Sequence, residues 1–115
     1  MSDNPQPYRS LPPKAAAELL RTQDALLFDV RTPPEFESHH IQGAVLLPIQ
    51  ELQTRHPEIP RDSKRPILIV CEHGIRSVHA CRALSEAGWT NLINVSGGMA
   101  AWMEEGLPFN AKGVA

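Results

Sequence analysis

The sequence predicts an α/β domain in which helices cover both faces of a mostly parallel β-sheet. Two apolar runs, at 25–28 and 67–70, are continuous rather than alternating, which is typical of strands buried on both faces. Shorter apolar runs lie at 44–47 and 92–95, and segments with helical patterning separate the runs. Strands that alternate with helices are joined in a parallel sheet by right-handed crossovers.

The composition favours one small domain with a packed core. The chain has 115 residues, of which 42% are hydrophobic and 21% charged. A net charge of -2 argues against a nucleic-acid partner, and no apolar run approaches the ~20 residues that span a membrane. The first seven residues lack signal-peptide features, and two cysteines do not indicate a disulfide framework. We therefore predict a cytoplasmic protein.

The first half of the chain begins with polar, proline-rich residues at 1–7, which we expect to form a flexible tail. A short edge strand is predicted at 8–11, before two prolines that suit the first turn of a helix over 14–21. A buried strand follows at 25–30, and Pro33 and Pro34 open a short helix that continues to Glu37.

The second half continues the alternation of strands and helices. The predicted elements are a strand at 44–47, a helix at 49–55, a loop at 56–66, the central strand at 67–70, a helix at 76–87, a last strand at 92–95 and a short helix that contains Met99, Trp102 and Met103. Gly88 and Gly106 are expected to end the two later helices. The predicted domain covers 8–109, and 110–115 is expected to be a C-terminal tail.

Cys71 follows the central strand directly, which places it at the carboxyl end of the sheet, where open α/β sheets bind ligands. The next helix would direct its N-terminus at the sulfur, so we expect a reactive thiolate. The backbone N–H groups of 72–76 can converge on the sulfur, with Gly74 allowing an unusual φ. Ser77 could cap the helix or bond to the thiolate. The alternative is a buried structural cysteine beside an ordinary turn.

Three strand ends are predicted to meet at this edge of the sheet. They are the residues Asp29 to Arg31, Cys71, and the segment 96–98. The loop after Cys71 would form the floor of a pocket, and the other two segments would form its walls.

Four sequence motifs resemble those of the single-domain rhodanese-like sulfurtransferases. The matching pieces are Asp29-Val30-Arg31, the turn His40-Ile41-x-Gly43-Ala44, the loop Cys71-x-x-Gly74-x-Arg76-Ser77, and Gly97-Gly98-x-x-Ala101-Trp102 with Gly106-Leu107-Pro108. The resemblance implies a rhodanese-like fold with a five-stranded parallel sheet and a six-residue active loop from Cys71 to Arg76. It further implies that Cys71 carries sulfane sulfur as a persulfide, with no metal or organic cofactor.

The same resemblance implies the substrates. The donor would be a small molecule such as thiosulfate or polysulfide, and the acceptor would be cyanide in an assay and a thiol or partner protein in the cell. Glu72 departs from many relatives, which carry a basic residue after the cysteine, and its carboxylate should repel a dianionic donor. A sulfur-relay or binding module with little turnover of free thiosulfate is therefore the second hypothesis.

A phosphatase or an arsenate reductase is a less favoured alternative. Rhodanese-like phosphatases have a similar loop, including the glutamate, but their arginine comes six positions after the cysteine. Arg76 comes five positions after Cys71. The shorter loop fits one extra sulfur atom and crowds a tetrahedral phosphate.

The remaining candidate residues have two interpretations each. Arg76 either binds the anionic end of the donor, which we favour, or forms a salt bridge that stabilises the loop. Arg31 either pairs with Asp29 or lines the pocket, and Asp29 is expected to be a structural hydrogen-bond partner. His73 either contacts substrate or is a solvated loop residue. The predicted substrate-binding set is Arg76, Glu72, His73, Gly74, Ile75, Ser77 and Arg31.

Cys71, His73, His79 and Cys81 resemble a set of metal ligands in their spacing. Residues two apart on a helix point to nearly opposite sides, so His79 and Cys81 cannot easily share a metal, and we predict none. Cys81 is instead expected in the core, and Trp89 and Trp102 are expected in core or hinge packing. A Cys71–Cys81 disulfide would require the helix to begin elsewhere.

Overall fold

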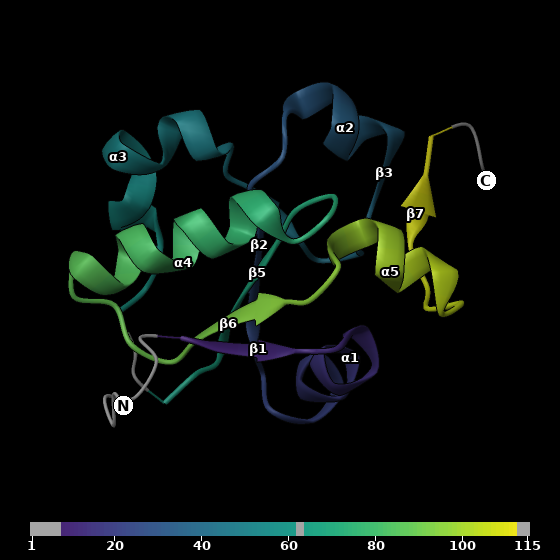
Figure 1. Cartoon of the computed structure of the whole chain (residues 1–115), viewed down its shortest axis with the longest axis horizontal. Helices are drawn as coiled ribbons and strands as arrows, with labels where there is room; N and C mark the ends of the chain where they lie inside the picture. Colours follow the sequence, from purple (N-terminus) through teal and green to yellow (C-terminus); the bar gives the residue numbers. More distant parts are fainter. Residues whose placement is uncertain (1–7, 62–63, 113–115) are drawn as a thin grey trace, which may run out of the picture.

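The computed structural model describes residues 8–61 and 64–112, and a five-stranded sheet forms its centre (Figure 1). The strand order is β1-β6-β5-β2-β4, and every neighbouring pair is parallel. The strands are β1 (Arg9–Leu11), β2 (Leu26–Asp29), β4 (Val45–Leu46), β5 (Ile67–Val70) and β6 (Leu92–Val95). The predicted fold class is therefore confirmed, with β5 in the middle of the sheet.

Helices cover both faces of this sheet, as predicted (Figure 1). One face packs against α3 (Leu52–Arg55) and α4 (Ile75–Glu86), together with the short 3-10 helices η1 (Ile49–Glu51) and η2 (His56–Glu58). The other face packs against α1 (Pro13–Thr22) and α5 (Gly98–Glu104). Helix α2 (Pro33–Ser38) follows β2 and lies beyond the carboxyl ends of the strands.

The alternation of side chains along β5 divides the core into two layers. Ile67 and Ile69 pack toward α4, whereas Leu68 and Val70 pack toward α1 and α5, and all four are buried. Trp89 and Trp102 lie in different layers, at 3% and 2% exposure, which confirms their predicted place in the core. A strand with buried side chains on both faces explains the continuous apolar run at 67–70.

The predicted elements differ from the observed ones mainly at their ends. Helix α4 begins at Ile75, one residue before the predicted start, and the strand predicted at 44–47 is only Val45–Leu46. The predicted loop at 56–66 begins with η2 (His56–Glu58). The ends of the predicted strands and helices shift by one or two residues, and the predicted strands and helices follow one another in the predicted order.

The segment 110–115, which was predicted as a C-terminal tail, begins with a short strand. Strand β7 (Asn110–Ala111) pairs antiparallel with β3 (His39–His40), and the Lys112 N–H donates to the Ser38 carbonyl at 2.9 Å. Two-residue strands carry no periodic signal, so this pairing depends on tertiary contact. The predicted N-terminal tail at 1–7 lies outside the described residues, as do 113–115.

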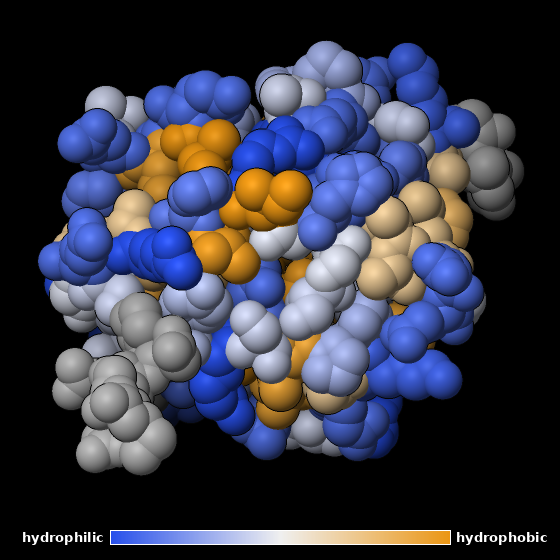
Figure 2. Space-filling model, viewed as in Figure 1, coloured by the Kyte–Doolittle hydropathy of each residue, from blue (hydrophilic) through white to orange (hydrophobic). Residues whose placement is uncertain are grey.

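An apolar groove lies between α3 and α4 and appears as the orange patch at the upper left of Figure 2. Its volume is about 540 Å³, and its lining includes Ile49, Leu52 and Leu84. None of the lining residues belongs to the loop 71–76, so the groove is separate from the predicted active loop. Across residues 8–61 and 64–112, every helix is too short or too polar to cross a membrane.

Candidate active site

Cys71 lies where β5 ends and the loop to α4 begins, with 1% of its surface exposed. Its Sγ atom accepts hydrogen bonds from the backbone N–H of Gly74 at 3.0 Å and of Ser77 at 3.3 Å. Gly74 has a φ of 88°, a left-handed conformation that glycine adopts without steric cost. The loop therefore bends so that two backbone donors point at the sulfur, an arrangement that stabilises negative charge there.

Ser77 bonds to the sulfur and does not cap the helix. It lies inside α4, which begins at Ile75, and its Oγ is 3.3 Å from Cys71 Sγ. On its other side, the hydroxyl bonds to the side chain of Asn94 on β6. Of the two roles expected for Ser77, the structure has the bond to the sulfur, and it does not have the cap because the helix begins two residues earlier.

The start of α5 contacts the Cys71 loop directly through the backbone. The N–H groups of Met99 and Ala100, in the first turn of α5, donate to the carbonyls of Cys71 at 2.8 Å and Glu72 at 3.0 Å. A Cβ on Gly98 would lie 2.3 Å from the Cys71 carbonyl oxygen. Only a glycine permits this approach, which explains Gly98.

Arg31 is fully buried and pairs with Asp29, the first of its two predicted interpretations. Its guanidinium donates to both carboxylate oxygens of Asp29, at 2.8 to 3.1 Å, and the side chains of both residues are 0% exposed. Burial opposes the charge of Arg31, but the hydrogen bonds and negative charges of Asp29 and Glu72 together outweigh burial and raise the pKa of Arg31. The prediction that Arg31 binds substrate is corrected, because no surface of this side chain is open to a donor.

Glu72 joins this buried pair to the active loop. Its Oε1 accepts from Arg31 Nη1 at 3.1 Å and lies 3.5 Å from Nε2 of His39. The His39 carbonyl in turn accepts from Arg31 Nη2 at 2.6 Å. The Glu72 side chain, 23% exposed, therefore has a structural role that its position after the cysteine did not reveal.

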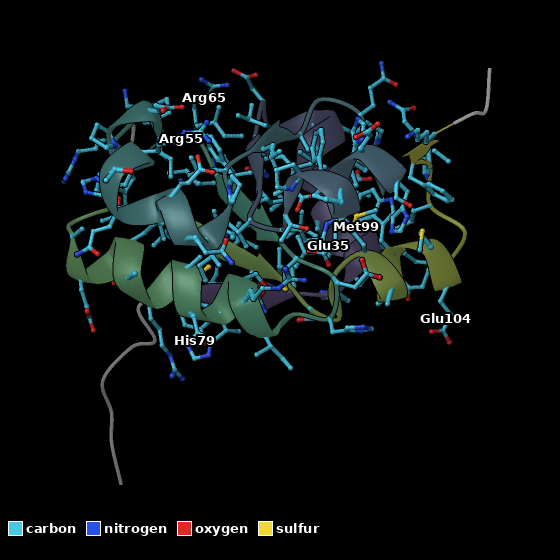
Figure 3. The ribbon with its side chains drawn as sticks, turned by 90° about the horizontal axis from the view of Figure 1, so that it is seen from above. Glu35, Arg55, Arg65, His79, Met99 and Glu104 are labelled. Carbon is cyan, nitrogen blue, oxygen red and sulfur yellow. The ribbon has the colours of Figure 1, made fainter. Side chains whose placement is uncertain are left out.

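Arg76 forms a salt bridge, which was the alternative to its predicted contact with the sulfur donor. Nη1 and Nη2 donate to the two carboxylate oxygens of Glu35 at 2.7 and 2.8 Å, a bidentate pair that fastens the first turn of α4 to α2. Figure 3 labels Glu35 on α2, above the start of α4. The Arg76 side chain remains 33% exposed. Its predicted contact with the donor is compatible with this geometry.

Glu35 also caps α2, because its carboxylate accepts from the Thr32 N–H and hydroxyl, each at 3.0 Å. The bonds from Arg76, opposed by partial burial and supported by Thr32, lower the pKa of Glu35 from 4.5 to about 2. A carboxyl group with a lowered pKa stabilises the folded state above its unfolded pKa and loses this contribution as pH falls through the folded value.

We therefore expect wild type to lose its stability advantage over Glu35→Gln between about pH 4.5 and pH 2. Urea unfolding midpoints of both proteins, measured from pH 6 down to pH 2, check this expectation. A difference between the two midpoints that stays constant over the whole range would contradict it.

The second cysteine and the two nearby histidines differ in burial and in the direction of their side chains. Cys81 is buried, and burial, with a smaller effect of the charge on Cys71, raises the pKa of its thiol to about 12. His79 is exposed and projects outward from α4 (Figure 3), and His73 is exposed in the loop. Within the described ranges, no three His, Cys, Asp or Glu side chains gather in metal-binding geometry.

The structure adds three residues to those predicted. Glu35, His39 and Asn94 reach the site from α2, β3 and β6, through Arg76, Glu72 and Ser77 respectively. Glu35 carried one detectable signal, the Thr32-x-x-Glu35 capping box. The contacts of His39 and Asn94 join elements distant in the sequence and leave no local pattern.

Comparison with known proteins agrees with the fold. Residues 12–105 match the model of the rhodanese-like domain. A sulfurtransferase from Allochromatium vinosum is 41% identical over 81% of this chain and 85% of its own length. The thiosulfate sulfurtransferase GlpE of Actinobacillus succinogenes is 33% identical, over 88% of this chain and 89% of its own.

A solved structure is also similar to this chain over nearly all of its own length. The rhodanese-related protein from Thermoplasma volcanium superimposes with a TM-score of 0.81 and 33% identity, and covers 90% of this chain and 98% of its own. The predicted resemblance rested on the same strands and loops that these matches cover. The chain is therefore a member of the rhodanese-like domain family.

Proposed function

We propose that this protein is a sulfurtransferase that carries sulfane sulfur on Cys71 as a persulfide, and that thiosulfate or polysulfide is its small-molecule donor. The proposal rests on the hydrogen bonds to Cys71. Its Sγ atom accepts hydrogen bonds from two backbone N–H groups, at 3.0 and 3.3 Å. Donors fixed by the backbone stabilise an anionic sulfur without reorganising during the reaction. A relative named thiosulfate sulfurtransferase supports the choice of donor.

With thiosulfate, the reaction proceeds in two balanced steps. The Cys71 thiolate attacks the outer sulfur of thiosulfate, a new S–S bond forms, the S–S bond of thiosulfate breaks, and sulfite leaves with the electron pair. An acceptor nucleophile, which is cyanide in an assay and a thiol or partner protein in the cell, then attacks the outer sulfur of the persulfide. This second step releases the Cys71 thiolate unchanged, so the cycle needs no metal or organic cofactor.

Arg76 is proposed to orient the anionic end of the donor. A guanidinium has five N–H donors, and the pair with Glu35 occupies one on each of Nη1 and Nη2. Glu35 thus holds the guanidinium in one orientation, and its remaining donors stay available at the mouth of the loop. His73 and Ile75, both exposed, and Gly74 would form the rest of that mouth.

The test is the intact mass of the protein after incubation with thiosulfate or polysulfide. We expect wild type to gain ~32 Da, removable by dithiothreitol, and Cys71→Ser to gain nothing. Cys81→Ala is the matched control, because Cys81 is buried in the core and should not take part. The absence of an adduct on wild type with both donors would overturn the proposal.

A sulfur-relay role, with little turnover of free thiosulfate, is the second candidate. The two arginines near the sulfur, Arg31 and Arg76, bond to three carboxylates, those of Asp29, Glu35 and Glu72. This balance leaves no excess positive charge for a dianion. Ile75, in contrast, is 67% exposed beside the loop, where it could contact a partner protein.

Two free cysteines suit a reducing compartment such as the cytoplasm.

The enzyme and the relay module both form the Cys71 persulfide, and they differ in how fast they turn over free thiosulfate. An enzyme of free thiosulfate should produce thiocyanate through many cycles with thiosulfate and cyanide. A relay module should form the persulfide once from polysulfide and release it slowly to cyanide. Steady-state thiocyanate production, measured alongside the mass gain, therefore separates the two.

A further inference from the structure

Behind the sulfur, four polar side chains from different parts of the sheet and α4 form a continuous chain. Cys71 Sγ is 3.3 Å from Ser77 Oγ, Ser77 Oγ bonds to Asn94 Oδ1, and Asn94 Nδ2 bonds to Ser10 Oγ at 3.2 Å. Ser10 and Asn94 are direct partners in the parallel pairing of β1 with β6, which explains why their side chains meet. We call these four residues the Asn94 chain.

The inner part of the Asn94 chain is shielded from water, whereas its outer end is open. Ser77 is 0% exposed, Cys71 1% and Asn94 4%, while Ser10 is an exposed residue of the edge strand. The Ser77 hydroxyl therefore depends on protein groups for its hydrogen bonds, and burial makes the direction of each bond energetically important.

A serine hydroxyl has one proton, so Ser77 can donate to only one neighbour at a time. In the observed arrangement it donates to Asn94 Oδ1 and accepts from the Cys71 thiol. A thiolate or persulfide anion has no proton to offer and would face a lone pair of Ser77. The observed direction of the two Ser77 hydrogen bonds suits the neutral thiol of Cys71, and the opposite direction suits the anion.

We propose that Asn94 is a positioning residue that lets the Asn94 chain reverse when the sulfur becomes anionic. A half-turn of the amide exchanges Oδ1 and Nδ2, so that Nδ2 donates to Ser77, Ser77 donates to the sulfur, and Ser10 donates to Oδ1. Asparagine suits this place because its amide accepts at one end and donates at the other. An aspartate could only accept, and a leucine could do neither. The role rests on the proposed function of Cys71 as the nucleophile.

The test is the rate at which iodoacetamide alkylates Cys71 as a function of pH, followed by peptide mass so that Cys81 is scored separately. The thiolate is the reacting form, so the midpoint pH of this profile measures how well the protein stabilises the anion. We expect Asn94→Leu to move the midpoint upward and slow alkylation at pH 7 about threefold, and Asn94→Asp to slow it about tenfold, a shift of about one pH unit.

The decisive comparison is made in the Ser77→Ala background. There Asn94→Leu should cause no further shift, because Asn94 acts through Ser77. Ile93→Val is the matched control, since Ile93 is a buried residue of the same strand that packs in the opposite layer. It should lower the urea midpoint without moving the alkylation profile.

Three outcomes would overturn the proposal. They are an Asn94→Leu midpoint equal to or below that of wild type, the same Asn94→Leu shift with and without Ser77, and a shift of similar size in Ile93→Val. Urea unfolding of every variant shows whether the variant is folded. If Asn94→Leu is not folded, Asn94→Asp replaces it in the test, because aspartate is closest in shape to asparagine. Alkylation needs no sulfur donor, so failure of Cys71 to form a persulfide would reject the proposed function and still leave this test readable.

Discussion

Gly98→Ala is expected to abolish persulfide formation and to lower the free energy of unfolding by about 3 kcal/mol, from steric overlap and left-handed backbone strain. The added Cβ would lie 2.3 Å from the Cys71 carbonyl oxygen and 2.6 Å from the carbonyl carbon and oxygen of Glu72. These are backbone atoms of the active loop, which cannot rotate away as a side chain can. Relief therefore requires the loop or the start of α5 to move.

The same movement would break the bonds from Met99 and Ala100 to the loop carbonyls and so disturb the backbone that supports Gly74 and Cys71. Urea unfolding and the mass gain after polysulfide treatment check both parts of the prediction. Gly106→Ala is the matched control, because Gly106 has a φ of 74° and an added Cβ would meet nothing within 4 Å. It should carry only the backbone strain, and equal effects of the two substitutions would contradict the steric argument.

Asp29→Asn should lower the free energy of unfolding by about 3 kcal/mol, because the buried charge of Arg31 loses the one carboxylate that is fully buried with it. Both Asp29 and Arg31 have side chains with 0% exposure, and three of the Arg31 bonds go to the Asp29 carboxylate. Glu72 would be the remaining anionic partner of Arg31, at 3.1 Å. The urea midpoint, with an unchanged slope of the transition, measures the loss.

Glu37→Gln provides the contrast for this second prediction. Glu37 forms an ion pair with Lys112 at 3.0 Å, but the two side chains are 66% and 70% exposed. Water screens such a pair, so the substitution should barely move the urea midpoint. If Asp29→Asn were as mild as Glu37→Gln, the buried pair would not have the structural role that its geometry indicates.

Much of the architecture was predictable because it depends on local patterns. The continuous apolar runs at 26–28 and 67–70 reflect strands with two buried faces, and Gly74 after Cys71 reflects a turn that needs a positive φ. The parallel order of strands then places Asp29, Cys71 and Gly97 at one edge of the sheet. Cys71 could be selected from the sequence because strand, turn and helix follow one another there without interruption.

The partners of the charged residues could not be predicted in this way. Arg31 and Arg76 both lie near Cys71 and both looked able to bind an anion, yet Arg31 is buried against Asp29 while Arg76 stays partly open beside Glu35. An arginine has a long side chain, so its position in the sequence does not determine which carboxylate it reaches. The packing of α2 over the strand ends makes that choice.

The contacts of the Asn94 chain and the pairing of β7 with β3 likewise depend on the tertiary structure. Asn94 meets Ser77 and Ser10 because β6 lies between β1 and β5, and Asn110 meets His40 because the segment after α5 turns back toward the end of α2. Local sequence patterns indicate the longer strands, such as β2, β5 and β6. Which polar groups then touch across strands depends on register and burial, and these exist only once the chain has folded.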